Sequence, residues 1–509
     1  MKPLLQFTVN ALGRSRIFSL CLCAPVPQCL LLVSLFHGAG LLASDKQSNV
    51  LFILVDDLGW RVLGCYGSTL YETPNIDHLA TQGMRFTAAY AASMCSPTRA
   101  SIMTGKYPAR LGITTWIGDK QPDNFNENTK YLPPRYVDRL PLEEVTIAET
   151  LREHGYATQL AGKWHLGPEG FFPEDQGFDS NRGGVNWSAP NGGKRYFSPY
   201  GNPRLDDGPD GEHLPDRLAQ ETIAFMKEQS DARRPFFAYL PFYSVHVPLM
   251  APADLIEKYQ RMDLPEEQYR GNVVRKDYLA VQNNPVVAAM VEAMDRAVGK
   301  ALASLTELGL SNDTIVILTS DNGGTNHTSN APLRAGKCHL YEGGIRVPLI
   351  VRWPGRIEAG STCSEMISCT DFYPTILDLL DLPLLPDQHL DGISITPLLH
   401  GADSLSRKTL YWHFPHYMRD QPSSAIRSGD WKLIEFFEDD RLELYNLQED
   451  IGEHVNLSAK HPDRVERMHG LLKAWRQDVD AATLTENLNY NPTNSVSGIP
   501  LGFDHMGDR

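Results

Sequence analysis

Asn49-Val50-Leu51-Phe52-Ile53-Leu54-Val55, followed at once by Asp56-Asp57, is the stretch that decides the fold. A run of uncharged, mainly large apolar residues is typical of a strand that is buried on both faces. Residues 157–161, 236–240 and 314–319 have the same character, and each run also leads into a polar cluster. The sequence therefore predicts an α/β fold with a mostly parallel sheet, in which ligands bind beyond the carboxyl ends of the strands.

Helical segments are expected between these strands. Thr146 and Glu149 form a capping-box pattern that opens a helix ending near Gly155. Residues 286–308 form a long amphipathic segment that ends at Gly309. The sheet and its flanking helices would make a catalytic domain at residues 45–399, with a further strand at residues 347–351.

The sequence changes character beyond about Leu399. Hairpin patterns with short turns follow one another, and a helix is expected near residues 465–479. We therefore expect a smaller C-terminal α+β subdomain at residues 400–509, which ends in a polar tail after Leu484.

The first 44 residues are typical of a secretory leader. Three basic residues precede an apolar run, and small residues stand near Ala43 and Ser44. A membrane anchor is the alternative, but polar and proline residues interrupt the run before it reaches the roughly 20 apolar residues that a span requires. We therefore expect no stable membrane span and an exported protein, either periplasmic or secreted.

The net charge is −15, and removal of the leader, which holds three basic and no acidic residues, would leave −18. This balance argues against nucleic acid as a partner. Five cysteines lie beyond the leader, an odd number that marks one thiol as special. Cys363 and Cys369 could pair, or both could be free buried thiols.

Oxygen ligands gather at two of the predicted strand ends. Asp56 and Asp57 follow the first strand, and Asp321 and Asn322 follow the strand at residues 314–319. A set of oxygen donors without paired His or thiolate ligands indicates calcium or magnesium rather than zinc. The competing interpretation is that each polar pair only solvates a strand end.

Cys95-Ser96-Pro97-Thr98-Arg99 has the pattern of a helix start, because Ser96 suits the cap and Pro97 suits the first helical position. Gly105 is a natural end for that helix. Free backbone N–H groups at a helix N-terminus favour an anion, and Arg99 would add a permanent positive charge. A buried structural cysteine beside an ordinary helix is the alternative.

This stretch, with the run Thr104-Gly105-Lys106-Tyr107-Pro108-Ala109-Arg110, resembles the signature of the type I, formylglycine-dependent sulfatases of the alkaline phosphatase superfamily. In that family the cysteine is oxidised by a formylglycine-generating enzyme. Thr98 stands where the family most often has Ser. The blocks that begin at Gly162, His246 and Leu333 match further family motifs, and the resemblance extends from residue 49 to about residue 479.

The resemblance implies an alkaline phosphatase-like fold, a large mixed sheet between helices. It implies one Ca²⁺, with Mg²⁺ as the lesser alternative, and formylglycine derived from Cys95. The implied metal ligands are Asp56, Asp57, Asp321, Asn322 and the modified Cys95. The implied catalytic residues are Cys95, Arg99, Lys163, His165, His246 and Lys337. The expected substrate contacts are Lys163, His246, Lys337, Trp187 and Arg334.

In the implied mechanism, the aldehyde of residue 95 is hydrated and one hydroxyl attacks sulfur, after which the ester S–O bond breaks. Lys163 and Lys337 would offset the charge of the sulfate, and His246, with Lys337 nearby, would protonate the departing alcohol. His165 would then take a proton from the second hydroxyl, which expels sulfate. Arg99 would hold the diol and its loop.

The substrate is a separate question. The aromatic and acidic insert around Trp187, residues 196–200 and residues 207–210 suits a sugar pocket, and it resembles that of bacterial sulfatases of sulfated galactose or N-acetylgalactosamine. Residues 411–416 could line the same pocket. A core position for these aromatic residues is the other interpretation.

Three competing functions remain open. An arylsulfatase of broad small-ester specificity would use the same residues. A phosphatase or phosphonate hydrolase of the same superfamily would need a second metal set, which the sequence does not offer convincingly. An inactive carbohydrate-binding homologue would require an unmodified Cys95.

Overall fold

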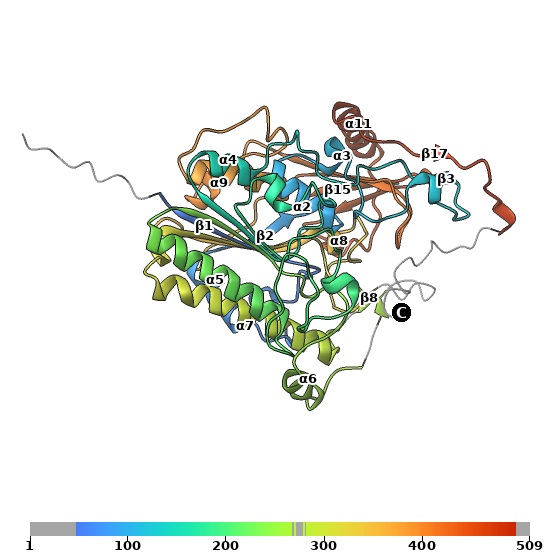
Figure 1. The fold of residues 1–509 in the computed structure, drawn as a ribbon. Helices are drawn as coiled ribbons and strands as arrows, with labels where there is room; N and C mark the ends of the chain where they lie inside the picture. The colour runs from blue at the N-terminus through green and yellow to red at the C-terminus, as the bar shows by residue number, and fades with distance from the viewer. Residues whose placement is uncertain (1–46, 267–268, 271–277, 280, 495–509) are drawn as a thin grey trace, which may run out of the picture. The chain divides into compact units, whose positions relative to one another are not determined.

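The computed structural model describes residues 47–266, 269–270, 278–279 and 281–494 (Figure 1). The leader predicted at residues 1–44 lies outside these described residues. Within them, no helix is both long enough and apolar enough to cross a membrane.

Nine strands form one sheet in the part of the chain that the structure describes. Five neighbouring strands are parallel to one another, whereas β10 is antiparallel to both of its neighbours. From edge to edge the strands are β11 (Thr362–Cys363), β2 (Met84–Tyr90), β10 (Arg346–Arg352), β9 (Thr314–Ser320), β1 (Asn49–Val55), β6 (Phe236–Pro241), β4 (Ala157–Ala161) and β5 (Ser180–Arg182), with β12 (Ile367–Ser368) also paired to β2. The mixed, mostly parallel sheet is thus confirmed.

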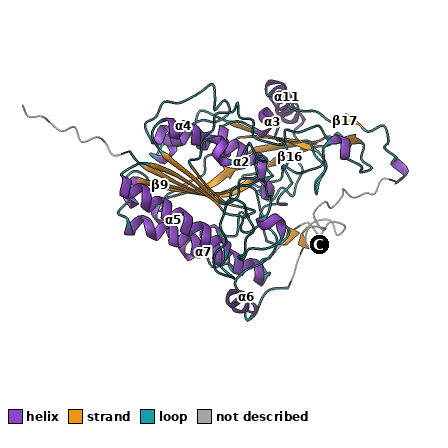
Figure 2. Ribbon diagram, in the orientation of Figure 1, coloured by secondary structure: helices purple, strands orange, loops and turns teal. Residues whose placement is uncertain are grey.

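Helices cover both faces of this sheet (Figure 2). Alternate residues of β1 point to opposite layers: Ile53 packs in one apolar cluster and Phe52 in the other. The first cluster contains residues of α1 (Pro74–Gln82), α5 (Leu214–Ala232), α6 (Ala253–Gln260) and α7 (Pro285–Glu307). The second contains residues of α2 (Cys95–Thr104), α4 (Ile147–Glu153), α9 (Phe372–Leu379) and α10 (Thr396–Leu399). Burial on both faces explains why the central strands are apolar throughout.

The ends of two helices follow from their sequences. Thr146 caps α4, and its hydroxyl accepts the N–H of Glu149 while the Glu149 carboxylate accepts the N–H of Thr146. The side chain of Asn284 caps α7 by accepting two backbone N–H groups. Both predicted helices are confirmed to within a few residues.

A second, antiparallel sheet follows in the C-terminal part. Its strands are, in order, β13 (Thr409–Phe414), β14 (Ser423–Ser428), β15 (Trp431–Phe436) and β16 (Leu442–Asn446). Helix α11 (Pro462–Asp478) packs on one face of this sheet. The other face shares an apolar cluster with Tyr90 of β2 and with Met94 and Ile345. The smaller strand-rich part is therefore present, and the boundary at residues 399–400 stays a prediction.

The described chain also contains several shorter elements. In the tail, β17 (Thr485–Glu486) pairs with β3 (Tyr131–Leu132), and β7 (Tyr269–Arg270) pairs with β8 (Tyr278–Leu279). Two short helices are α3 (Pro108–Leu111) and α8 (Glu342–Ile345).

Candidate active site

The register of the central strands places the predicted ligands next to one another. Val55, the last residue of β1, lies opposite Ser320, the last residue of β9. Asp56 and Asp57 therefore leave the sheet beside Asp321 and Asn322. Contacts between the two strand ends follow directly: the Asp57 N–H donates to Asp321 Oδ1 at 3.2 Å, and Asn322 Nδ2 donates to Asp57 Oδ1 at 2.7 Å. All four residues are buried.

Cys95 is the first residue of α2, and Met94 occupies the cap position. The prediction that Ser96 caps this helix is wrong, because its hydroxyl has tertiary partners instead. It donates to the His165 carbonyl at 3.0 Å and accepts the N–H of Ile117 at 3.1 Å. The predicted end at Gly105 is confirmed by its left-handed backbone, with φ of 70°.

Three cations lie against the three carboxylates, and each is almost fully buried. The Arg99 guanidinium donates to Asp321 Oδ2 at 2.8 and 3.1 Å. Lys337 Nζ lies 2.6 Å from Asp57 Oδ1, and Lys163 Nζ donates to Asp56 Oδ2. The cluster is therefore close to electrically neutral, because three negative and three positive groups share it.

His165 is oriented toward residue 95. Its Nδ1 lies 3.5 Å from Cys95 Sγ, while Nε2 lies 2.8 Å from the Ile117 carbonyl oxygen. A carbonyl only accepts, so Nε2 carries the hydrogen of the neutral ring and Nδ1 presents a lone pair to residue 95. Burial and the charge of Lys163 lower the pKa of His165, which keeps the ring neutral.

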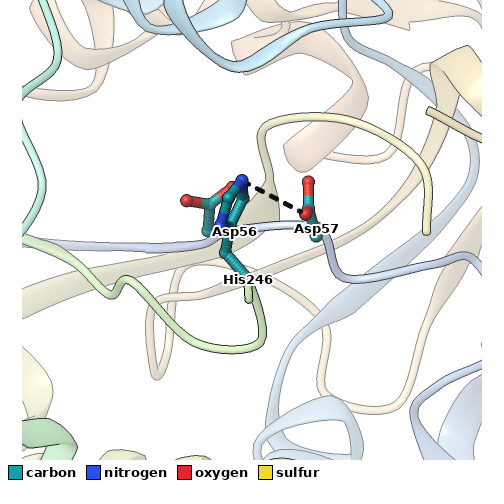
Figure 3. Close-up of side chains that lie close together, drawn as sticks. All are labelled: Asp56, Asp57 and His246. Atoms are coloured by element: carbon teal, nitrogen blue, oxygen red, sulfur yellow. Dashed lines mark ion pairs between the residues drawn. The ribbon is translucent and has the colours of Figure 1, made fainter. Parts of the chain in front are cut away.

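His246 approaches from the loop after β6, with Nε2 at 3.8 Å from Asp57 Oδ2 (Figure 3). Its Nδ1 lies 2.9 Å from the Val247 carbonyl oxygen, so Nε2 has the free lone pair when the ring is neutral. Burial and the Lys337 charge lower the pKa of His246 to about 3. The hydroxyl of buried Tyr196 lies 2.7 Å from the Tyr243 and His246 carbonyl oxygens and supports this loop.

The carboxylates do not share one electrostatic environment. Burial and the nearby negative charge of Asp56 raise the pKa of Asp321 to about 6. Burial would also raise the pKa of Asp57, but the charge and hydrogen bond of Lys337 overcome that effect and hold it below its usual range. Burial raises the pKa of the Cys95 thiol, so an unmodified Cys95 would be a poor nucleophile at neutral pH.

The donor set fits a metal ion. Among the described residues, Asp56, Asp57 and His246 can present ligand atoms within 4.8 Å of one another (Figure 3). Two buried oxygen atoms, Asp56 Oδ1 and Asn322 Oδ1, have no hydrogen-bond partner among the described residues. Buried polar atoms normally have partners, and oxygen donors of this kind suit a hard cation such as Ca²⁺ or Mg²⁺.

Two of the predicted substrate-binding residues, Arg334 and Trp187, lie outside the buried cluster of charged residues. The Arg334 guanidinium lies 3.9 Å from the Tyr341 ring centroid and donates to Tyr445 and to the Glu453 carbonyl. These contacts join it to the C-terminal sheet rather than to the site cluster. Trp187 is half-buried and lies two residues after Val185, whose carbonyl accepts the His165 N–H at 3.1 Å.

The aromatic insert is mostly core. Tyr196 and Tyr200 are buried in the cluster around α5 and α7. In the segment at residues 411–416, Tyr411 stacks on Trp475 and Trp412 donates to the Ala91 carbonyl. These contacts favour the core interpretation for Tyr196 and Tyr200, whereas Tyr411 and Trp412 also line a small cavity beside Met94 and Pro97. Cys363 and Cys369 are both free thiols.

Trp116 also lies at the site, although no motif in the sequence indicated it. Its ring centroid lies 6.3 Å from that of His165, and the side chain is half-buried. The next residue, Ile117, orients both His165 and Ser96 through its backbone. No motif marks the loop that carries Trp116 and Ile117. The one local signal is Gly118, a residue type that is common in turns.

Comparison with known proteins agrees with this geometry. The family model described as Sulfatase matches residues 48–382, and the model described as N-sulphoglucosamine sulphohydrolase, C-terminal, matches residues 335–478. The chain belongs to the sulfatase family. It is therefore a sulfuric ester hydrolase, and its fold is that of the alkaline phosphatase-like superfamily.

Individual sulfatases resemble the chain over most of its length. A sulfatase from Formosa agariphila is 33% identical and covers 85% of this chain and 89% of its own. N-acetylgalactosamine-6-sulfatase from dog is 33% identical over 79% of this chain and 74% of its own. The crystal structure of Ps i-CgsB in complex with k-i-k-neocarrahexaose has a TM-score of 0.70 and 27% identity, covering 87% of this chain and 96% of that chain.

Gly162, directly before Lys163, yields a prediction about this sulfatase. Its φ is +134°, and an added Cβ would lie 1.9 Å from the Pro241 carbonyl oxygen. We expect Gly162→Ala to lower the free energy of unfolding by about 1–3 kcal/mol for the collision, in addition to the backbone strain. It should also lower sulfatase activity because Lys163 is displaced. Urea unfolding and turnover of 4-nitrophenyl sulfate measure the two effects.

Gly155→Ala is the matched control. Gly155 also has a positive φ, +88°, but an added Cβ would meet nothing within 4 Å. This variant should lose only about 1–2 kcal/mol, for the left-handed backbone, and keep full activity. Equal losses in the two variants would refute the role of the Gly162 contact.

Proposed function

We propose that this sulfatase hydrolyses sulfate esters of a carbohydrate, with formylglycine made from Cys95 and one Ca²⁺ ion. The observation that carries the proposal is the buried, charge-balanced cluster around Cys95, in which two oxygen atoms have no hydrogen-bond partner among the described residues. A neutral cluster that gains a divalent cation becomes positive, which favours a sulfate anion at that place.

Asp56, Asp57, Asp321 and Asn322 would hold the ion. When bound, Ca²⁺ would act as a Lewis acid toward the sulfate oxygens and the nucleophile. Residue 95, once converted to an aldehyde by a formylglycine-generating enzyme, would supply the hydrated nucleophile that a protonated thiol cannot. Mg²⁺ is the lesser alternative, because it demands stricter octahedral geometry than this mixed set of loops and strand ends offers.

The protein's own groups divide the remaining work. His165 presents the Nδ1 lone pair to residue 95, so it is placed to accept a proton from that residue. Arg99 donates to Asp321 and to the Lys163 carbonyl, which fixes the start of α2 against β4. Lys163 and Lys337 would offset the charge that develops on the sulfate oxygens.

Proton donation to the leaving alcohol is assigned to Lys337 and His246 together. Both contact Asp57, on its two different oxygen atoms. The pKa of Lys337 is raised, since Asp57 outweighs the effect of burial, whereas His246 is neutral before substrate binds. Lys337 is therefore charged before substrate binds, and His246, with Lys337 nearby, would protonate the departing alcohol from Nε2 once the bound sulfate anion favours the charged ring.

The proposal of a carbohydrate substrate is supported by two tryptophan side chains near His165, one from a segment before it in the sequence and one from a segment after it. Trp116 lies near the His165 ring. Trp187 lies two residues after Val185, whose carbonyl accepts the His165 backbone N–H. Aromatic faces suit sugar rings. The names of the N-acetylgalactosamine-6-sulfatase and of the neocarrahexaose complex favour the galactose or N-acetylgalactosamine type. The composition of residues 1–44 supports export, periplasmic or secreted.

Mass spectrometry of the tryptic peptide from Phe86 to Arg99 tests the modification. In active protein we expect the mass for an aldehyde in place of the Cys95 CH₂–SH group. Cys95→Ala should fold normally and be inactive. Active protein that carries only an unmodified thiol at position 95 would refute the mechanism.

Removal of the metal tests the ion. Chelation should abolish activity and lower the Tm, because three buried carboxylates lose their shared cation. Added Ca²⁺ should restore both, and a hundredfold excess over its Kd should stabilise the fold by about 2.7 kcal/mol. Full activity after exhaustive chelation would rule out the proposed site, and better rescue by Mg²⁺ would change the identity of the ion.

A substrate panel tests the leaving group. We expect higher kcat/KM for 6-sulfated galactose or N-acetylgalactosamine saccharides than for 4-nitrophenyl sulfate. Trp116→Leu should lower kcat/KM for the saccharide about threefold to tenfold, from the loss of aromatic stacking. Trp431→Leu, in the C-terminal sheet, is the control. Turnover of the aryl ester alone would make the enzyme a small-ester arylsulfatase.

A further inference from the structure

Of the three cations at the site, Lys337 lies farthest along the chain from any regular helix or strand. Lys163 lies only two residues after β4 ends at Ala161, and Arg99 belongs to α2. The segment that carries Lys337 must therefore be held by other contacts. Its nearest support in the chain is the single-turn helix α8, Glu342–Ile345.

The glycines of helix α8 contact both the segment that carries Lys337 and the strand end that carries Asp321 and Asn322. The Gly343 N–H donates to the Arg334 carbonyl at 2.8 Å, and an added Cβ on Gly344 would lie 2.5 Å from the Gly336 carbonyl oxygen. On the other side, the Gly323 N–H, directly after Asn322, donates to the Gly344 carbonyl at 3.0 Å. A displacement of α8 would thus move both the Lys337 segment and the Asp321–Asn322 strand end.

The C-terminal part holds α8 by its first residue. Lys432 of β15 is fully buried, and its Nζ lies 2.9 Å from both Glu342 Oε1 and Glu453 Oε1. Glu453 Oε2 accepts the Glu342 N–H at 2.7 Å. The Glu453 carbonyl also accepts from Arg334, which begins the Lys337 segment. Two separate contacts therefore connect the C-terminal part to this segment.

The remaining side of Glu342 is also occupied. Tyr90 donates to Glu342 Oε2 at 2.7 Å, and Arg346 lies 3.1 Å from the same oxygen. Burial would raise the pKa of Glu342, but Lys432 and Arg346 outweigh it and hold the pKa at about 2. Glu342 is consequently an anion with a fixed position rather than a mobile side chain.

We propose that Lys432 and Glu453 are positioning residues for sulfate-ester hydrolysis, and that they act through Glu342 and α8 on Lys337 and on the Asp321–Asn322 strand end. The inference rests on the roles proposed above for Lys337 and the metal ligands. It gives the C-terminal sheet a part in the reaction although none of its residues needs to touch the substrate.

Lys432→Met tests the proposal, because it removes the cation and keeps a side chain of similar length. We expect kcat/KM for 4-nitrophenyl sulfate to fall about 100-fold, as a displacement of about 1 Å at the site would cause. We also expect the Ca²⁺ affinity, measured by calorimetry on metal-depleted protein, to fall about 10- to 100-fold, as for other residues that orient metal ligands.

Arg476→Met is the matched control, because the ion-pair partner of Arg476 lies on the same strand as Lys432. Arg476 of α11 pairs with Glu435 of β15 at 2.5 Å, with both side chains mostly buried, and Glu435 belongs to neither α8 nor the Lys337 segment. This variant should lower the Tm but leave kcat/KM and Ca²⁺ affinity of the folded protein unchanged. If Lys432→Met loses no more of either than Arg476→Met, the proposal is refuted.

A double variant covers the case in which Lys432→Met does not fold. Lys432→Met with Glu453→Gln removes one charge of each sign and should regain stability, yet kcat/KM and Ca²⁺ affinity should remain low. Recovery of both to within twofold of the wild type would overturn the proposal.

Lys337→Ala, assayed alongside, separates the positioning proposal from the proposed function. If Lys337→Ala is active, the proposed role of Lys337 is refuted. The Ca²⁺ affinity of Lys432→Met still decides whether Lys432 is a positioning residue.

Discussion

The whole structure depends on the burial of Asp56, Asp57 and Asp321 at the ends of two adjacent strands. Three carboxylates taken out of water would each be very costly alone, so each must have a cation within hydrogen-bond distance. Arg99, Lys163 and Lys337 supply those charges from three different segments of the chain. The register of β1 with β9, the start of α2 and the turn after β4 are all constrained by this requirement, because each places one member of the set.

This arrangement also explains how an acidic protein can act on an anion. A net charge of −15 offers no long-range attraction to sulfate. The attraction has to be local, and it has to appear only when the site is complete. A neutral cluster that accepts one divalent cation satisfies both conditions, since the excess positive charge then lies next to residue 95 and inside a region from which water is largely excluded.

The sequence predicted those parts of the structure that depend on local pattern. The apolar runs located β1, β4, β6 and β9, and the strand ends located the carboxylates. β2 was missed because Arg85 and Thr87 interrupt its apolar character, and its partners lie far away in the chain. The cap of α2 was misassigned because Ser96 bonds to His165 and Ile117 instead of its own helix. Composition alone did not decide between a core and a pocket position for Tyr196, which the structure buries, and it gave no sign of the contacts of Arg334 with Tyr445 and Glu453.

The three cations differ in how firmly the chain holds them, and this difference links the small C-terminal sheet to the chemistry. A strand end and a multi-turn helix are rigid supports, so the positions of Lys163 and Arg99 follow from the main fold. Lys337 depends on close approaches between glycines, where an added Cβ on Gly323 would lie 1.8 Å from the Gly343 carbonyl oxygen. Such contacts fix the position of the Lys337 segment only while α8 stays packed against it and against the Asp321–Asn322 strand end. The buried ion pairs from Lys432 to Glu342 and Glu453 hold α8 in contact with the Lys337 segment from outside the larger sheet. This role explains why an ionic cluster that is costly to bury lies next to the active site.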